Sequence, residues 1–183
     1  MEETKVFPRV PLHDDEITLR ELRGSDVPLI SSACNDPDIQ RWLPLPFPYT
    51  LEDATWYIEE FAGNAQTSGR GIVFAIDAKN NFIGCIDVKR AEWLNGDCEI
   101  GYWTAPEQRG FGYMSRALDV LSKWVLREQG FCRVEVRAAV ENLASQRVAE
   151  KAGFTREGIA RKAGRVHTGR VDLVIFSRVD DDI

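Results

Sequence analysis

The chain has 183 residues, a formal net charge of −6 at pH 7 and four cysteines. This length fits one domain with a sizeable core that needs no disulfide or metal to stabilise it. The negative charge argues against a nucleic-acid partner. No charged-then-apolar leader opens the sequence, and no apolar run approaches about 18 residues, so we expect neither secretion nor a membrane span.

The cysteines indicate a reducing compartment. Cys34, Cys85, Cys98 and Cys132 show no Cys-x-x-Cys spacing. Three of them, Cys85, Cys98 and Cys132, lie in strand-like apolar runs. We therefore interpret these three as reduced core thiols of a cytoplasmic protein.

The N-terminal part of the chain predicts an arm, a strand and two short helices. Residues 1–15 are polar, contain two prolines and predict a flexible arm, which leaves 16–183 as a single domain. Ile17–Leu22 alternates as a strand does. One helix is expected to start at Ser25 or Asp26 and to end near Cys34, and a second one covers Asp36–Trp42.

The central part predicts a stiff loop, a helix and a meander of strands. Three alternating prolines make Leu43–Tyr49 an extended loop, which either packs over the core or forms one wall of a substrate pocket. Thr50 and Asp53 resemble a capping box at the start of a helix. Three strands with antiparallel turns follow, at Gly71–Ala78, Phe82–Arg90 and Cys98–Trp103.

A glycine-bearing turn, Arg109–Met114, joins the last of these strands to a long amphipathic helix that ends near Gly130. The first turn of a helix has free N–H donors and the positive end of the dipole, so it attracts anions such as a pyrophosphate. Gly110 and Gly112 lack a Cβ and permit close approach. The alternative is a structural tight turn, and the pattern is neither a P-loop nor a dinucleotide fingerprint.

The C-terminal part predicts a parallel strand, a short helix and a strand pair. Phe131–Ala138 follows the long helix, which implies a right-handed crossover and a parallel pairing. One face of this strand carries Arg133, Glu135 and Arg137, so we expect that face to border a groove. Asn142 caps a short helix through Ala152. The final strands are expected at Phe154–Ala160 and Val171–Val179, joined by a basic loop, Arg161–Arg170.

Three stretches in this order resemble the GNAT superfamily of N-acetyltransferases. The first is Glu99–Thr104 with Gln108–Tyr113, which is similar to the family's strand and its acyl-CoA signature, Gln/Arg-x-x-Gly-x-Gly/Ala. The second is Asn142–Ser145 with Glu150–Phe154, and the third is Glu157-Gly158 with Arg161 and Asp172. The ending looks like the branch that contains the RimJ- and RimL-type acetyltransferases of ribosomal protein N-termini and many small-amine acetyltransferases.

The resemblance implies an α+β fold. Its sheet would have seven mostly antiparallel strands, with one parallel, splayed strand pair and about four flanking helices. It also implies acetyl-CoA as co-substrate and a primary amine, on a protein N-terminus or a small molecule, as acceptor. Backbone N–H groups would hold the pyrophosphate, from Arg109, Gly110, Phe111, Gly112, Tyr113 and Met114. The strand edge at Tyr102, Trp103 and Thr104 would bind the pantetheine arm, and Asn142 would add a hydrogen bond unless it serves only as a helix cap.

One residue departs from the signature. The family usually has Gly or Ala at its last position, where this chain has Met114. That side chain either crowds the cofactor or points into the core, and the backbone N–H survives in both cases.

Acetyl transfer needs a deprotonated amine, a stabilised oxyanion and a proton for the departing thiolate. The resemblance assigns the proton to Ser145, whose alternative is an ordinary helix serine. Glu99 is the candidate base, directly or through water, and its alternative is an exposed strand carboxylate. His167 is a further candidate acid or base by residue type, and its alternative is a solvated loop histidine. The two histidines, His13 and His167, have no ligand-like spacing, so we expect no metal.

Competing functions remain open at this level. A non-catalytic acyl-CoA sensor or interaction module on the same fold is the main alternative, and a dinucleotide oxidoreductase lacks an early βαβ unit. The acceptor would be chosen by Trp42–Trp56 and Arg161–Arg170. A homodimer is compatible with the sequence, and neither a nucleic acid nor a membrane is expected as a partner.

Overall fold

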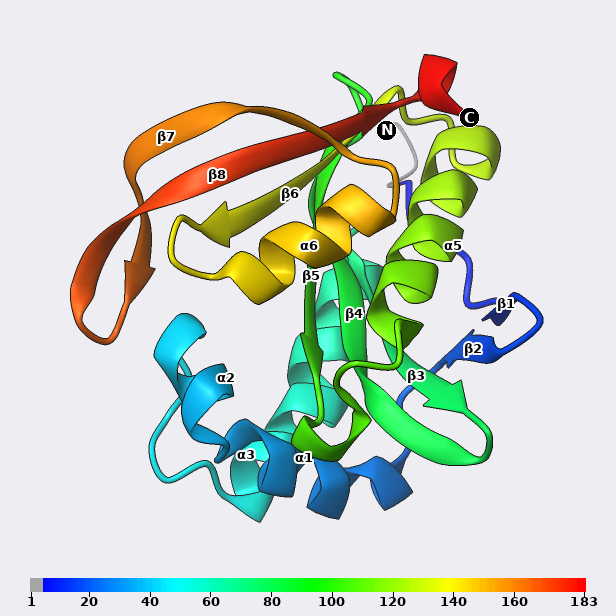
Figure 1. The fold of residues 1–183 in the computed structure, drawn as a ribbon. Helices are drawn as coiled ribbons and strands as arrows, with labels where there is room; N and C mark the ends of the chain where they lie inside the picture. Colours follow the sequence, from blue (N-terminus) through cyan, green and yellow to red (C-terminus); the bar gives the residue numbers. More distant parts are fainter. Residues whose placement is uncertain (1–4) are drawn as a thin grey trace.

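The computed structural model describes residues 5–183 and contains one eight-stranded mixed sheet (Figure 1). The strands lie in the order β1-β2-β3-β4-β5-β6-β8-β7. Their bounds are β1 Leu12–His13, β2 Ile17–Arg20, β3 Ile72–Ala78, β4 Asn81–Glu92, β5 Asp97–Thr104, β6 Arg133–Ala139, β7 Thr155–Val166 and β8 Gly169–Val179. The expected α+β class is confirmed, but the sheet has eight strands instead of seven. The additional strand is β1, whose two residues pair with β2 and are too few to produce a periodic pattern.

The parallel pair of the sheet, β5 and β6, separates after three paired positions. Asp97, Cys98 and Glu99 pair with Arg133, Val134 and Glu135 in that order. Beyond them β5 continues beside β4 to Thr104, and β6 continues beside β8 to Ala139. The predicted splayed pair is therefore confirmed. Each strand is held by its outer neighbour, so the facing edges keep unpaired backbone groups that can bind an extended ligand.

Helices cover both faces of the sheet. Their bounds are α1 Val27–Cys34, α2 Pro37–Trp42, α3 Leu51–Trp56, the π-helical turn η2 Tyr57–Ala62, α4 Gly63–Thr67, α5 Tyr113–Glu128 and α6 Leu143–Lys151. On β4, Cys85 packs with residues of α1 and α3, whereas Ile86 packs in the cluster that contains α5. Neighbouring strand residues point to opposite faces, so these two groups of helices lie on opposite sides. Within residues 5–183, no helix has both the length and the apolar character needed to cross a membrane.

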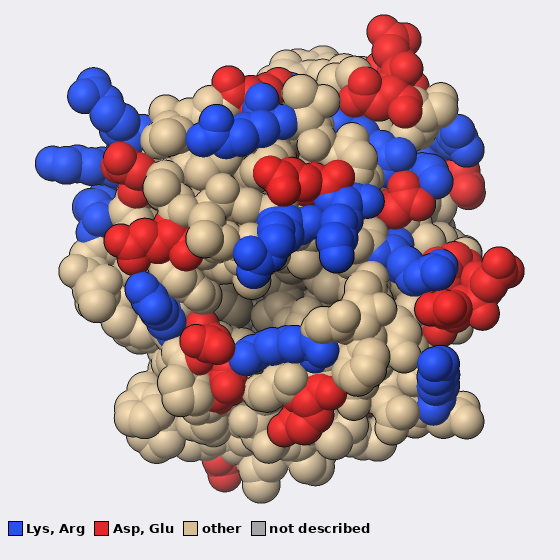
Figure 2. All heavy atoms as spheres, viewed as in Figure 1, with Lys and Arg blue, Asp and Glu red and all other residues tan. Residues whose placement is uncertain are grey.

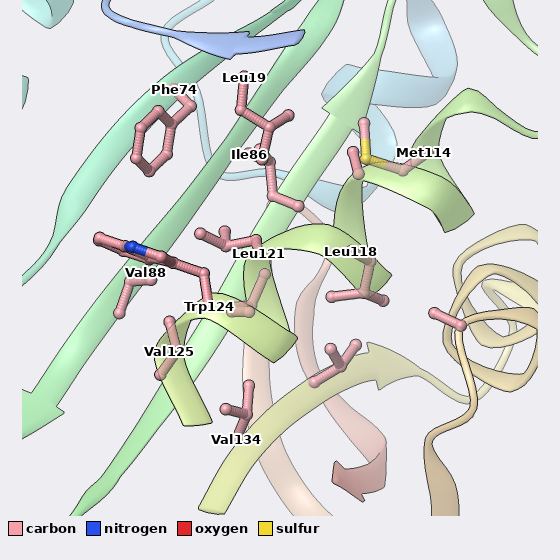
Figure 3. Packing of buried hydrophobic residues seen from close by; sticks show 14 of the residues in the cluster. Leu19, Phe74, Ile86, Val88, Met114, Leu118, Leu121, Trp124, Val125 and Val134 are labelled. Atoms are coloured by element: carbon pink, nitrogen blue, oxygen red, sulfur yellow. The ribbon is translucent and has the colours of Figure 1, made fainter. Parts of the chain in front are cut away.

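The long helix α5 carries the larger core. Its apolar residues recur at helical spacing and face the sheet (Figure 3). Leu118, Leu121 and Val125 are 0% exposed and pack in one cluster with β2, β3 and β4 residues such as Leu19, Phe74 and Ile86. The helix stops at Gln129, and Gly130 follows with φ +77°. Only a residue without Cβ adopts this angle freely, so the expected glycine stop is confirmed.

The described part of the N-terminal segment packs onto the domain. Phe7 is fully buried, and its ring stacks on Phe131 at a centroid distance of 5.7 Å and lies 4.7 Å from Trp93. Phe7 and Leu12 therefore contribute to the core, in a segment where the sequence predicts a flexible arm. The pattern hides this because one phenylalanine in a polar, proline-containing segment gives no periodicity. Residues 1–4 of the predicted arm lie outside the described residues.

Two further expectations need correction. Cys132 is exposed, because it precedes β6 and its Sγ faces the carbonyl oxygen of Gly96 at 3.3 Å, whereas Cys34 is buried. The expected basic loop Arg161–Arg170 is mostly strand, and only His167 and Thr168 form the turn between β7 and β8. A bulge in β7 breaks the alternation there: Lys162 has φ +51° and its N–H donates to the Asp172 carboxylate at 2.7 Å.

Candidate active site

A cavity of about 730 Å³ lies where β5 and β6 separate. Residues on both faces of β5 line it, including Ile100 and Tyr102 on the α5 side and Glu99 and Gly101 on the opposite side. Because neighbouring strand residues point to opposite faces, the cavity passes through the gap in the sheet. Figure 2 shows a hollow in the surface with Lys and Arg side chains on its rims.

The glycine turn opens into this cavity. Gly110 and Gly112 have φ +86° and +83°, and an added Cβ would meet no atom within 4 Å at either position. Gly112 is the N-cap of α5 and supplies no side-chain acceptor. The first N–H groups of a 16-residue helix are therefore free of a side-chain cap and face a cavity wall formed by Gly112, Tyr113 and Met114. This is the geometry that an anion needs.

Two side chains of the signature have structural roles. Met114 is 4% exposed and lies in the α5 core, so its side chain does not crowd the cavity (Figure 3). The Arg109 guanidinium donates to the carboxylates of Asp36 at 2.5 Å and Asp38 at 3.2 Å. Arg109 thus ties the turn to α2.

Ser145 and Tyr102 form a hydroxyl pair inside the cavity. The Ser145 hydroxyl donates to the Tyr102 oxygen at 3.0 Å, and the Tyr102 hydroxyl donates to the Ser145 carbonyl oxygen at 3.0 Å. Burial raises the pKa of the Tyr102 phenol well above its ordinary value, against a smaller lowering by the Ser145 hydrogen bond. Tyr102 therefore stays protonated at neutral pH and can hold the serine side chain in place.

Asn142 begins the helix that carries Ser145. Its side-chain oxygen accepts the Ser145 N–H at 3.1 Å, as a helix cap does. The predicted cap is confirmed. The amide also lines the cavity, so its nitrogen remains a possible donor toward a ligand.

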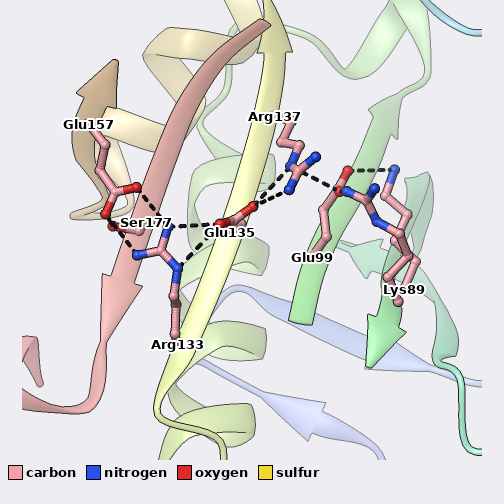
Figure 4. A network of polar contacts seen from close by, with 8 residues as sticks. Lys89, Glu99, Arg133, Glu135, Arg137, Glu157 and Ser177 are labelled. Carbon is pink, nitrogen blue, oxygen red and sulfur yellow. Dashed lines mark hydrogen bonds and ion pairs between the residues drawn. The ribbon is translucent and has the colours of Figure 1, made fainter. Parts of the chain in front are cut away.

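Glu99 lies at the point where the two strands part, and it is only 7% exposed. The interpretation as an exposed strand carboxylate is therefore wrong. Its carboxylate contacts Lys89 at 3.0 Å, Arg137 at 3.5 Å and Arg90. Figure 4 shows this group continuing across β6 to Arg133, Glu135 and Glu157. Through Glu99 and Arg137 this group links β5 to β6 at the last position where the two strands are paired.

The cavity gathers most of the predicted site. Every predicted catalytic or cofactor-binding residue lines it except Phe111, which is 65% exposed and stacks on Tyr113. Of the expected acceptor loop, Trp42, Leu43 and Pro44 line the cavity, whereas Tyr49 is in the core. His167 lies outside the lining, in an exposed turn.

Sequence reasoning placed Arg137 on a strand face expected to border a groove, and Arg137 lines the cavity; it did not single out the cationic lining residues Lys89 and Arg147. The charged face of the strand at 133–137 was the available signal for Arg137. Lys151 lies in the Glu150–Phe154 segment, which gave it no role. Lys89 and Arg147 carry no motif, since single lysines and arginines are common on exposed faces. Among residues 5–183, no group of His, Cys, Asp and Glu side chains converges as a metal site would require.

Comparison with known proteins places this geometry in a class. Residues 16–155 match the family described as Acetyltransferase (GNAT) domain. The ribosomal-protein-serine acetyltransferase of Escherichia coli (strain K12) is 30% identical over 158 residues, which cover 84% of this chain and 87% of that protein. The spermidine N(1)-acetyltransferase of Vibrio cholerae is 25% identical over 146 residues, covering 79% of this chain and 82% of that protein.

A solved structure shares the whole fold. The RimL ribosomal L7/L12 alpha-N-protein acetyltransferase in complex with Coenzyme A superposes with a TM-score of 0.83 at 24% identity, covering 98% of this chain and 100% of that one. The split sheet and its through-going cavity thus define a class of acyl-transfer enzyme. The chain belongs to the GNAT family of acetyltransferases. It is an acetyl-CoA-dependent N-acetyltransferase.

Proposed function

We propose that this enzyme acetylates the primary amine at a protein N-terminus by direct transfer from acetyl-CoA. The observation that carries the proposal is the cavity that passes through the sheet between β5 and β6. One substrate can enter from the α5 face and the other from the opposite face, and the two meet beside Ser145. Holding both reactants in one cavity supplies much of the rate enhancement of a two-substrate reaction.

The residues present fit coenzyme A. The uncapped N–H groups of the Gly110–Met114 turn would take the pyrophosphate. The edge of β5 from Tyr102 to Thr104 lacks a β6 partner and would pair with the pantetheine amides. Because Met114 is buried in the core, its departure from the family signature leaves the backbone donors accessible.

Ser145 would donate the proton that the departing thiolate needs. Its hydroxyl lines the cavity and is held by Tyr102. In this structure the Ser145 proton points to the Tyr102 oxygen, so the hydroxyl would turn toward the sulfur when the C–S bond breaks.

The role of Glu99 as the general base stays a prediction. It lines the cavity on the side opposite α5, but Lys89, Arg90 and Arg137 surround its carboxylate. These ion pairs hold the carboxylate in place, which favours a role in ordering the acceptor side of the cavity.

A protein N-terminus suits the acceptor side better than a polyamine does. Lys89 and Arg137 line this side and Glu99 is already paired with both. A polyamine brings several positive charges, which such a surface repels, whereas a peptide brings one ammonium group and a backbone. The 30% identity to a ribosomal-protein-serine acetyltransferase supports the same choice.

The experiment is a panel of N-terminal peptides and polyamines incubated with acetyl-CoA, followed by thiol release and mass spectrometry. We expect thiol release with peptide N-termini at kcat/KM values at least about 100-fold above those for spermidine. Faster turnover of spermidine would contradict the acceptor, and tight coenzyme A binding without any turnover would favour a sensor. A cytoplasmic location, a possible homodimer and the absence of nucleic-acid or membrane partners stay predictions.

A further inference from the structure

A second carboxylate, that of Asp87, lies next to the cavity on the acceptor side. Asp87 is on β4 directly opposite Gly101 of β5. Its Oδ1 lies 3.0 Å from the position that a Cβ of Gly101 would occupy, and the Lys89 Nζ lies 3.1 Å from the same position. Gly101 lines the cavity. Asp87 itself is not among the lining residues. Its carboxylate borders the cavity at Gly101, where no side chain separates the two.

Unlike the other carboxylates nearby, the Asp87 carboxylate has no ion pair or hydrogen bond within the described residues. Glu99 is held by ion pairs, and Asp26 and Asp77 share Arg20. Among the described residues, burial and the charge of the neighbouring Lys89 are the influences on Asp87, and no hydrogen bond is among them. A partly buried carboxylate without a partner has lone pairs available for a ligand's N–H groups.

Burial affects Asp87, Cys85 and Tyr57, and of these three Asp87 has the pKa closest to neutrality. The titratable groups that face it are Lys89 and Cys85 on β4, Glu99 on β5 beside Lys89, and Tyr57 on η2, while its β3 partner is Val73. Burial raises the pKa of Asp87 to about 6, against a lowering by Lys89. Burial also raises the pKa of the Cys85 thiol and the Tyr57 phenol well above their ordinary values, so both stay neutral.

We propose that Asp87 accepts the proton of the acceptor's ammonium group, which makes it a catalytic residue of the proposed amine acetylation. The N–H bond of the ammonium breaks and an O–H bond forms on Asp87, leaving a neutral amine whose lone pair attacks the thioester carbonyl carbon. The C–S bond then breaks, and the thiolate takes a proton from Ser145. The second proton of the attacking nitrogen restores the Ser145 hydroxyl, and Asp87 releases its proton to solvent.

The test uses Asp87→Asn, which keeps the shape and removes the proton acceptor. We expect kcat to fall about 100-fold. The pH dependence of kcat at saturating acceptor should change as well: the acidic limb, near pH 6 in the unmodified enzyme, should move to the amine's own pKa of about 8. Coenzyme A affinity should change less than about 3-fold, because Asp87 lies away from the turn that holds the phosphates. Asp97→Asn makes the same chemical change on the same pair of strands but at the start of β5, opposite Glu92 and away from Gly101, so it is the matched control.

A second variant, Gly101→Ala, tests the same role with the carboxylate in place. Its methyl group would stand between Asp87 and the cavity, so we expect a similar loss of kcat. An acidic limb that stays near pH 6 in Asp87→Asn, or a Gly101→Ala enzyme with full kcat, would overturn the role of Asp87. If Asp87→Asn does not fold, the Gly101→Ala result decides. An unmodified protein that acetylates no amine would instead overturn the proposed function.

Discussion

The two faces of β5 present different kinds of groups to the cavity. On the α5 face the cavity is bounded by the helix start at Gly112 and by an apolar core in which Leu118 is fully buried. On the opposite face it is bounded by charged side chains, with Glu99 held between β4 and β6. The polar groups of the first face are backbone N–H donors, whereas those of the second face are ion-paired side chains. From this difference we expect the co-substrate to be bound by main-chain groups and the acceptor to be selected by charged side chains.

The largest effect is expected where the two faces meet. Ser145→Ala removes the proton donor and should lower kcat by about 100-fold or more, since general acid catalysis contributes about 10²–10⁴-fold. Tyr102→Phe, which loses only the group that positions Ser145, should lower kcat by about 10-fold. Steady-state kinetics with acetyl-CoA measures both. Wild-type kcat in Ser145→Ala would refute the assignment.

The next effect concerns the stability of the α5 face. Leu118→Ala leaves a cavity in the core and should lower the free energy of unfolding by about 2–5 kcal/mol in urea denaturation. The control is Leu94→Ala, because Leu94 is 98% exposed and its truncation should cost less than about 0.5 kcal/mol. Equal midpoints for the two variants would show that this face does not depend on helix packing.

On the charged face, Glu99→Gln breaks the contacts to Lys89, Arg90 and Arg137. We expect a loss of about 1–3 kcal/mol in unfolding free energy, because the buried partner is removed from half-exposed cations. The acceptor KM should rise while coenzyme A affinity, measured by calorimetry, stays within about 3-fold. A larger change in coenzyme A affinity than in acceptor KM would contradict the division between the two faces.

The smallest effect is a dependence of stability on pH. Hydrogen bonds from Arg133 and then Ser177 lower the pKa of Glu157 from 4.5 to about 2. The folded form therefore gains stability from this group above pH 4.5, and that gain is lost as pH falls toward 2. Glu157→Gln should flatten this part of the curve of unfolding free energy against pH. An unchanged curve would show that the exposed ion pair contributes nothing measurable.

The sequence predicts the α5 face well and the charged face poorly. Gly110, Gly112 and the apolar spacing of α5 are local signals, so the turn, the helix and its stop at Gly130 follow from neighbouring residues. The contact between Glu99 and Arg137 joins residues from strands that a helix separates, and the role of Asp87 depends on an absent side chain at Gly101. Such contacts arise from strand register, which a single sequence does not specify residue by residue.

The same reasoning explains the misjudged segments. Phe7 is buried by aromatic rings that come from three distant parts of the chain, Trp93, Trp124 and Phe131. The strand β7 is hidden by its bulge, which puts Lys162 at a positive φ and interrupts the alternation. In both cases contacts between distant parts of the chain determine the local structure, and the local sequence pattern does not reveal these contacts.

The most direct test of the account is a crystal structure of the protein with coenzyme A. The account predicts the pyrophosphate within hydrogen-bond distance of the N–H groups of Gly110–Met114, the pantetheine arm along the free edge of β5, and the sulfur beside the Ser145 hydroxyl. Coenzyme A bound outside the gap between β5 and β6, or phosphates held by side chains with the turn left free, would contradict it.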